Sequence, residues 1–244
     1  MASPDVGRNQ GAPLFPKRNL SERYFISGRA LDRALAHQLG AFADRLPKNG
    51  VRAADVGCGR QPYRRLLERY ADEYVGMDVQ ASIADGYAPP GVRPIENGRL
   101  PSEDHGFDLI LSSQVVEHVE HLQRHIEELY RILKPGGLLF LSTHGNFVKH
   151  DHDDFWRWTD RGLEVELTRH GFVVENCIPV VTGHANLCLH AIQAAAHVLS
   201  GKGLRRAFPP VSAALNTLGR LLDRTPSSTS DWWPCMYLVV SSRR

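Results

Sequence analysis

The sequence predicts an α/β protein, built on an open, mostly parallel, seven-stranded sheet with helices on its faces. From residue 51 onwards, short apolar segments alternate with amphipathic helical segments, a pattern typical of parallel sheets. A glycine-rich turn follows the first apolar segment, and Pro135-Gly136-Gly137 separates a helical segment from the next strand. The 244 residues, of which 42% are hydrophobic, suit one large domain with a substantial core.

The chain before the first strand is expected to contain a tail and one helix. Residues 1–19 are rich in Gly, Pro, Asn and Arg, which predicts a flexible N-terminal tail. Leucines from Leu31 to Leu39 recur at helical spacing. They predict an amphipathic helix that begins at Ser21 and ends near Pro47.

The strands and helices of the sheet region follow in order. The fourth expected strand, at residues 107–112, is mostly apolar, which is typical of a strand buried on both faces. Helices are expected at 63–70, 118–133 and 159–170, where apolar residues recur at helical spacing. The seven expected strands are 51–56, 73–79, 92–95, 107–112, 138–142, 172–181 and 236–241.

The alternation stops between residues 183 and 230, where two apolar-rich helical runs occur at 184–199 and 211–222. We therefore divide the remaining chain into a core at 20–182, a helical insertion at 183–230 and a last strand within 231–244. A lid or core-capping helix pair is the favoured interpretation of the insertion. A homodimer face and a contact with a membrane surface are the alternatives, because arginines flank its apolar stretches.

Composition excludes several classes of protein. Lys and Arg number 29 and Asp and Glu 27, with no long basic run, so nucleic-acid binding is disfavoured. No apolar run reaches the roughly 18 residues of a transmembrane helix, and the N-terminus lacks the apolar core of a signal peptide. The four cysteines form no C-x-x-C pair. A cytoplasmic protein without a zinc knuckle is expected.

The first chemical motif is the turn Asp55-Val56-Gly57-Cys58-Gly59 at the end of the first strand. Glycines there let a ligand approach the backbone. Pro62 stands where a dinucleotide fingerprint has its third glycine, which weakens a nicotinamide or flavin site. Asp78 follows about 20 positions after the turn and suits a ribose diol.

Three further motifs follow the glycine turn and Asp78 along the chain. The whole series resembles the class I S-adenosylmethionine-dependent methyltransferases, of the small-molecule type called the type 11 group. The resemblance covers about residues 50–180 and the last strand, and implies a Rossmann-like sheet. The additional motifs are Phe107-Asp108-Leu109-Ile110, Val116-Glu117-His118-Val119 and Arg131-Ile132-Leu133-Lys134-Pro135-Gly136-Gly137.

The resemblance implies a binding site for S-adenosylmethionine. Gly57 and Gly59 would face its methionine part, Asp55 its amino group or sulfonium, and Asp78 its ribose hydroxyls. The complete set of expected cofactor-binding residues is Asp55, Gly57, Cys58, Gly59, Asp78, Val79, Glu96, Asn97, Gln114 and Val115.

Four of these residues are expected at the two ends of the cofactor. Glu96 or Asn97 would meet the adenine, although many relatives have Asp-Ala at these positions. Gln114 and Val115, just past the fourth strand, would border the methyl-transfer point.

The acceptor side is expected in the loop after the fifth strand. It contains three histidines, His144, His150 and His152, together with three aspartates. We interpret one of the histidines as a general base, because an unperturbed imidazole titrates near neutral pH. A divalent metal site is a second interpretation, and a purely structural polar loop is the third. We place the base ahead of the metal and predict no metal.

Further residues are expected around the acceptor or in a structural role. Glu117 and His118 start a predicted helix, where an acid also favours the helix dipole, so a structural role competes strongly with a functional one. Aromatic side chains beside a helix start often serve packing instead. The expected acceptor-binding residues are Tyr63, Asp154, Trp156, Arg157 and Trp232.

The expected function is methyl transfer from S-adenosylmethionine to a small-molecule acceptor, with O or N favoured over C by the histidine-rich loop. Gly59-x-x-Pro62-Tyr63-Arg64 and Asp154–Thr159 resemble methyltransferases of secondary-metabolite, sugar or cell-surface biosynthesis. Two alternatives come from other classes. One is a nucleotide-cofactor oxidoreductase on a similar sheet, and the other is a non-catalytic cofactor-binding protein that supports a partner.

Overall fold

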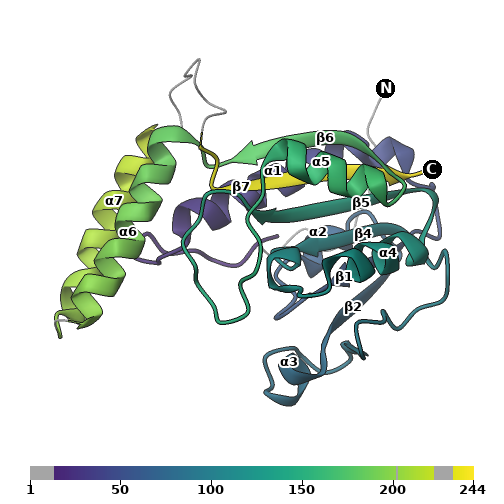
Figure 1. Cartoon of the computed structure of the whole chain (residues 1–244), viewed down its shortest axis with the longest axis horizontal. Helices are drawn as coiled ribbons and strands as arrows, with labels where there is room; N and C mark the ends of the chain where they lie inside the picture. The colour runs from purple at the N-terminus through teal and green to yellow at the C-terminus, as the bar shows by residue number, and fades with distance from the viewer. Residues whose placement is uncertain (1–13, 202, 223–232) are drawn as a thin grey trace.

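The computed structural model describes residues 14–201, 203–222 and 233–244. Its centre is a seven-stranded sheet with the order β3-β2-β1-β4-β5-β7-β6 (Figure 1). Neighbours from β3 to β5 are parallel, whereas β7 is antiparallel to β5 and β6. The mostly parallel sheet is confirmed. The strands are β1 (Arg52–Val56), β2 (Glu73–Val79), β3 (Arg93–Ile95), β4 (Phe107–Ser113), β5 (Leu133–His144), β6 (Phe172–Val180) and β7 (Met236–Arg243).

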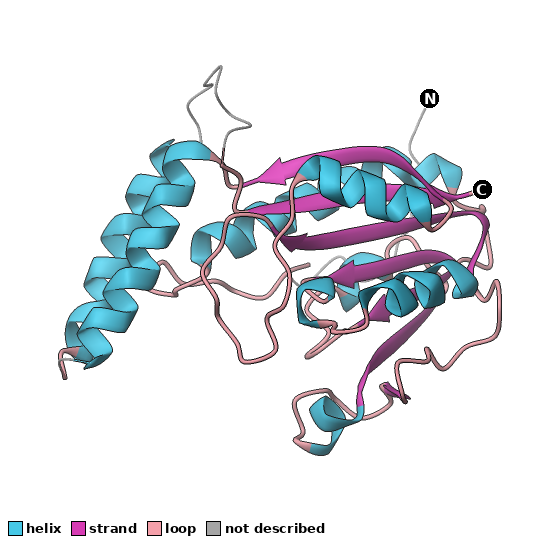
Figure 2. Ribbon diagram, viewed as in Figure 1, coloured by secondary structure: helices cyan, strands magenta, loops and turns pink. Residues whose placement is uncertain are grey.

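Helices cover both faces of the sheet (Figure 2). Alternate side chains of one strand serve opposite faces. Leu109 and Leu111 of β4 pack with α1 and α2, while Ile110 packs with α4 and α5. The helices are α1 (Phe25–Phe42), α2 (Arg64–Leu67), α3 (Gln80–Ala84), α4 (Leu122–Ile132), α5 (Asp160–Arg169), α6 (Gly183–Gly201) and α7 (Phe208–Leu222), with 3-10 turns η1 (Ala43–Arg45), η2 (Val116–His118) and η3 (Arg205–Ala207).

The start of β5 differs from the sequence-based expectation. The strand begins at Leu133 rather than at residue 138, and Leu133 pairs with Phe107. The pairing shifts register and resumes between Leu138 and Leu109. Pro135 lacks an N–H for the ladder and Gly136 has a φ of 76°, so this segment interrupts the pairing without ending the strand.

The helix predicted over 118–133 also differs. A 3-10 turn, η2, covers Val116–His118, and α4 begins only at Leu122. The helix predicted at 159–170 is close to the observed α5, Asp160–Arg169. The Thr159 hydroxyl caps this helix by accepting from the backbone N–H of Gly162 at 3.0 Å.

The predicted tail at 1–19 is described only from residue 14. The Arg18 guanidinium donates two hydrogen bonds to the buried Asp32 carboxylate of α1, at 2.8 and 2.9 Å. This bidentate ion pair holds residues 14–19 against the first helix.

Within the predicted insertion, α6 and α7 form a helical hairpin that projects from one end of the sheet (Figure 1). Its root packs on the chain before α1, where the Asn216 side-chain amide donates to the carbonyl oxygens of Leu20 and Glu22 at 2.6 and 3.0 Å. Gly219 leaves room for Ile26, because a Cβ there would lie 2.4 Å from the Ile26 side chain. No helix in the described ranges has the length and apolarity needed to cross a bilayer.

The Asn216 contact predicts a measurable contribution to stability. Asn216→Ala should lower the free energy of unfolding by about 1–3 kcal/mol, because the buried Asn216 amide no longer donates to the carbonyl oxygens of Leu20 and Glu22. Urea unfolding of the full chain measures this change. Thr217→Ala is the matched control, since Thr217 is exposed on the same helix and gains similar helix propensity. Equal stability of the two variants would contradict the assignment.

Candidate functional site

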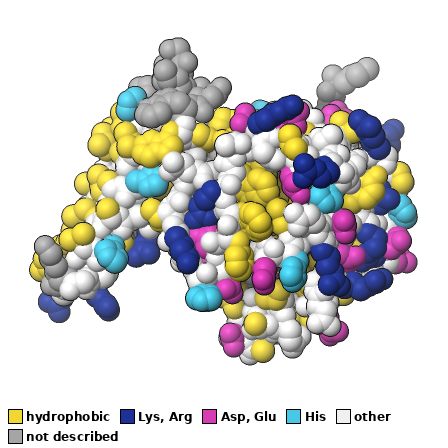
Figure 3. All heavy atoms as spheres, viewed as in Figure 1, with side chains coloured by type: hydrophobic (Ala, Val, Ile, Leu, Met, Phe, Trp, Pro, Cys, Tyr) yellow, Lys and Arg dark blue, Asp and Glu magenta, His cyan; other side chains and the backbone are white. Residues whose placement is uncertain are grey.

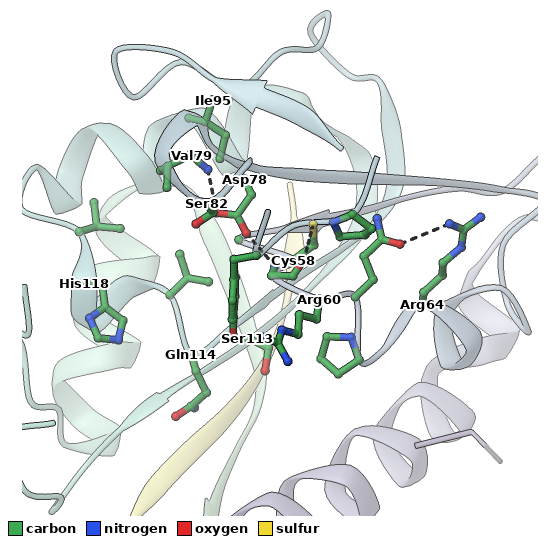
Figure 4. A pocket seen from close by; sticks show the side chains of 18 of the residues that line it. Cys58, Arg60, Arg64, Asp78, Val79, Ser82, Ile95, Ser113, Gln114 and His118 are labelled. Carbon is green, nitrogen blue, oxygen red and sulfur yellow. Dashed lines mark hydrogen bonds between the residues drawn. The ribbon is translucent and has the colours of Figure 1, made fainter. Parts of the chain in front are cut away.

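The described part of the chain contains a cavity of about 1580 Å³ at the carboxyl edge of the parallel strands. Ligands of open α/β sheets bind at this edge. The residues after β1, β2 and β4 contribute much of the wall, and Figure 4 shows Asp78, Ser113, Gln114 and His118 around the cavity. Charged side chains of both signs line it, which suits a zwitterionic ligand. They are Lys17, Arg60, Arg64, Arg65, Asp78, Asp151 and Asp153.

The turn after β1 brings backbone to the cavity. Gly57 has a φ of 73°, and a Cβ there would lie 2.4 Å from the Val115 side chain. Both the left-handed conformation and this close approach require glycine. The backbone N–H groups of Gly57 and Cys58 donate to the carbonyl of Met77 at 2.8 and 3.1 Å, so the turn is tied to β2.

Asp78 completes this connection from the end of β2. Its carboxylate accepts from the backbone N–H of Gly59 and from that of Val79, each at 2.7 Å. The Asp78 residue is only 7% exposed, yet it lines the cavity. Two backbone hydrogen bonds therefore orient a carboxylate where a ligand with hydroxyl groups can reach it.

Asp55 occupies a different position from the other expected cofactor residues. It is 2% exposed and does not belong to the cavity wall, and its carboxylate accepts from the Tyr74 hydroxyl at 2.9 Å. Burial raises the pKa of Asp55 to about 7. The structure thus places Asp55 beneath the glycine turn, where direct contact with a ligand would require rearrangement.

The remaining expected cofactor residues separate into two groups. Cys58, Val79, Asn97, Gln114 and Val115 line the cavity. Glu96, in contrast, is exposed and lies outside the cavity wall, with its carbonyl accepting from the backbone N–H of Arg99. Of the pair considered for adenine, the structure places only Asn97 at the cavity.

His144 is buried behind the cavity. Its Nδ1 lies 3.0 Å from Oε1 of Glu117, and its ring stacks on Phe147 with centroids 4.5 Å apart. Glu117 is itself fully buried and accepts from the Thr143 hydroxyl at 2.9 Å. His144 is not among the cavity-lining residues, and so contributes to a buried polar network.

His150 lies between two other imidazoles. Its ring centroid is 4.8 Å from that of His144 and 5.0 Å from that of His118. Nδ1 of His150 lies 3.0 Å from the carboxylate of Asp154. Burial and the nearby His144 lower the pKa of His150, which favours the neutral ring.

Among His118, His144, His150 and His152, His118 alone lines the cavity. His125 of α4 lines it as well, but burial lowers the pKa of that imidazole to about 4. His152 is almost fully exposed and pairs with the carboxylate of Asp153 at 2.6 Å. The sequence left the role of His118 open, and His118 was not among the expected site residues. The signal that could have identified it is its place just past β4, at the edge where ligands bind.

Asp154 and Arg157 shape the loop after β5. Asp154 is fully buried at its side chain, and the Arg157 guanidinium beside it lowers the pKa of its carboxyl. Arg157 also donates to the carbonyl oxygens of Phe147 and Val148 at 3.0 and 2.9 Å. The pair therefore acts as a clamp that holds the loop.

The other expected acceptor-binding residues do not gather at one place. Tyr63 is 7% exposed and packs edge-on against Phe15. Trp156 donates from its indole N–H to the carbonyl of Val119 at 2.8 Å. Neither belongs to the cavity wall, and Trp232 lies outside the described residues. The described ranges hold no group of three or more His, Cys, Asp or Glu side chains placed to bind a metal ion.

Part of the chain is similar in sequence to known methyltransferases. Residues 54–141 match the family model described as a methyltransferase domain. The mitochondrial ubiquinone biosynthesis O-methyltransferase of Mus musculus is 31% identical over 144 residues, which cover 54% of this chain and 37% of that protein. The chain thus spans less than half the length of this relative.

Solved structures share the fold at lower identity. The 4+2 cyclase SpnF matches with a TM-score of 0.55 and 21% identity, covering 86% of this chain and 81% of that one. Phosphoethanolamine N-methyltransferase 2 of Haemonchus contortus matches with a TM-score of 0.53 and 14% identity, covering 85% and 52%. The domain match over residues 54–141, together with the sheet order and the glycine turn, confirms the expected resemblance of this part of the chain to the class I S-adenosylmethionine-dependent methyltransferases.

Proposed function

We propose that the chain binds S-adenosylmethionine in this cavity and transfers the methyl group to an oxygen or nitrogen atom of a small-molecule acceptor. The observation that carries the proposal is the Asp78 carboxylate, held by Gly59 at the carboxyl edge of the sheet. The relative from Mus musculus is an O-methyltransferase, which supports oxygen as the acceptor atom. The secondary-metabolite or sugar context stays a prediction from the motifs.

The residues present fit this cofactor. The backbone at Gly57 comes so close to Val115 that any Cβ would overlap that side chain, and both residues line the cavity next to the region expected for the methionine moiety. Asp78 offers carboxylate oxygens to the two ribose hydroxyls, and the side chains of Val79 and Ile95 provide apolar wall for an adenine. The cofactor supplies an activated methyl group on its sulfonium, so the protein has to align the acceptor and exclude water.

Proton removal from the acceptor needs a base, and we assign it to His118. Nδ1 of His118 lies 2.6 Å from the backbone carbonyl of Asp153. A carbonyl oxygen only accepts, so Nδ1 carries the proton and Nε2 keeps the lone pair of the neutral ring. The same hydrogen bond orients the imidazole at the cavity wall. His144 and His150 then support the loop around His118 rather than contact the acceptor.

The cofactor assignment predicts the effect of one substitution. Asp78→Asn should weaken S-adenosylhomocysteine binding by about 1.5–3 kcal/mol, because a charge-assisted contact to the ribose hydroxyls is lost. Isothermal titration calorimetry measures the affinity. Asp85→Asn is the matched control, since Asp85 is exposed and lies outside the cavity wall. Unchanged affinity in Asp78→Asn, or no binding by the unmodified chain, would overturn the assignment.

The base assignment predicts a selective loss of turnover. His118→Ala should lower kcat about 100-fold or more, with S-adenosylhomocysteine affinity nearly unchanged. The assay follows transfer of a labelled methyl group from S-adenosylmethionine to a panel of phenols, catechols and amines. His121→Ala, at an exposed position nearby, should retain full turnover. Equal rates in the two variants would remove His118 as the base.

A measurement without an acceptor tests the same residue. Long-range ¹H–¹⁵N NMR of the imidazoles should show the Nδ1–H form of His118, because only that tautomer donates to the Asp153 carbonyl. A predominant Nε2–H form would contradict the assignment, whatever the acceptor proves to be.

A further inference from the structure

The helical hairpin of α6 and α7 belongs to an unusually acid-free part of the chain. Residues 176–222 contain no Asp or Glu, although the chain has 27 in 244 residues and about five would be expected there. The same segment contains Lys202, Arg205, Arg206 and Arg220. The hairpin is therefore basic within a chain of nearly balanced charge, which favours a negatively charged partner.

Each helix also exposes an apolar stripe at helical spacing. On α6 the exposed residues Leu187, Ala191, Ala194 and Val198 follow one another at three- and four-residue intervals. Leu187 and Val198 are 44% and 48% exposed. Figure 3 shows hydrophobic side chains gathered over this hairpin. On α7 the corresponding stripe is Val211, Ala214, Leu218 and Leu221.

The tip of the hairpin combines both properties. Leu204 is 53% exposed, and the adjacent Arg205 and Arg206 are exposed as well. Neither arginine forms an ion pair with another described residue. Basic side chains appear at this end of the hairpin in Figure 3, away from the sheet. An exposed apolar side chain next to two exposed arginines suits the boundary between lipid headgroups and acyl chains.

We infer that the α6–α7 hairpin docks on an anionic lipid bilayer. Arg205 and Arg206 bind lipid phosphates, and Leu204 with the exposed stripes enters the acyl boundary. The absence of acidic residues in the segment removes the repulsion that an anionic surface would otherwise exert. The helices lie at the surface of the bilayer, since neither is both long and apolar enough to span it.

Contacts at the root of the hairpin connect this surface to the functional site. The Asn186 side-chain amide donates to the carbonyl of Trp233 at 3.0 Å, and the ring of His190 stacks on that of Trp233. Nε2 of His190 lies 3.3 Å from the carbonyl of Asn146, in the loop after β5. The arrowheads of β5 and β6 point towards the hairpin (Figure 2), so docking holds the ligand-binding edge of the sheet near the membrane.

Vesicle flotation of the full chain tests the inference independently of methyl transfer. The chain should float with phosphatidylcholine vesicles that contain phosphatidylglycerol, and much less with phosphatidylcholine alone. Binding should fall as salt rises, because salt screens the phosphates. Failure of the unmodified chain to float with anionic vesicles would overturn the proposal.

Two charge-reversed variants locate the surface. Arg205→Glu with Arg206→Glu should weaken partitioning about thirtyfold or more, because each arginine near an anionic surface contributes to binding. Arg69→Glu with Arg93→Glu changes the same charge at exposed positions of the sheet region and should bind nearly normally. Equal loss in both would show a nonspecific charge effect and overturn the assignment to the hairpin.

A further variant separates lipid from a second copy of the chain. Leu218→Glu together with Leu221→Glu should abolish flotation and leave the mass by light scattering unchanged. The opposite outcome is an unmodified chain that is a dimer and does not bind vesicles, and a variant that is a monomer. That outcome would assign the stripes to self-association instead. Retained S-adenosylhomocysteine affinity and a cooperative melt establish that each variant is folded. If neither the unmodified chain nor any variant bound S-adenosylhomocysteine, that result would contradict the proposed function and leave the membrane inference unaffected.

Discussion

The hydrogen bond from the Gly59 backbone to the Asp78 carboxylate joins the ends of the first two strands, and the side of the cavity that we propose for the cofactor depends on it. With the paired N–H groups of Gly57 and Cys58 on the Met77 carbonyl, it holds the turn after β1 against β2. The arrangement uses backbone groups, a short acidic side chain and a glycine at a positive φ. These elements lie close together in sequence and in space, because β1 and β2 are adjacent parallel strands.

The side of the cavity that we propose for the acceptor is held together by different interactions. There the loop after β5 is held partly by contacts within the loop and partly by residues of η2, which lie far from it in the chain. Arg157 clamps Asp154 and two backbone carbonyls, Glu117 approaches His144, and the Asp153 carbonyl orients His118. A site assembled in this way would let the proposed acceptor side vary while the proposed cofactor side stays the same. The shared fold of a cyclase and an N-methyltransferase agrees with this separation, since the fold alone does not determine the reaction.

Much of the fold could be predicted from the sequence, because its signals are local. The alternation of short apolar runs with amphipathic helices identified all seven strands, and β2 matched its predicted bounds, Glu73–Val79. The boundaries that differed depend on tertiary pairing. Leu133 joins β5 because Phe107 of β4 is beside it, and α7 starts at Phe208 because prolines are tolerated in a first helical turn.

By itself, the sequence determined the parallel sheet, the glycine turn and the position of Asp78 at the end of the second strand, because these features follow from residues close in the chain. Only the tertiary structure decided which ionisable groups meet the cavity. It placed Asp55 beneath the turn, His144 behind Phe147 and His118 on the wall. Sequence reasoning identified a histidine-rich loop but could not order its imidazoles, since their exposure and tautomers depend on contacts between residues far apart in the chain.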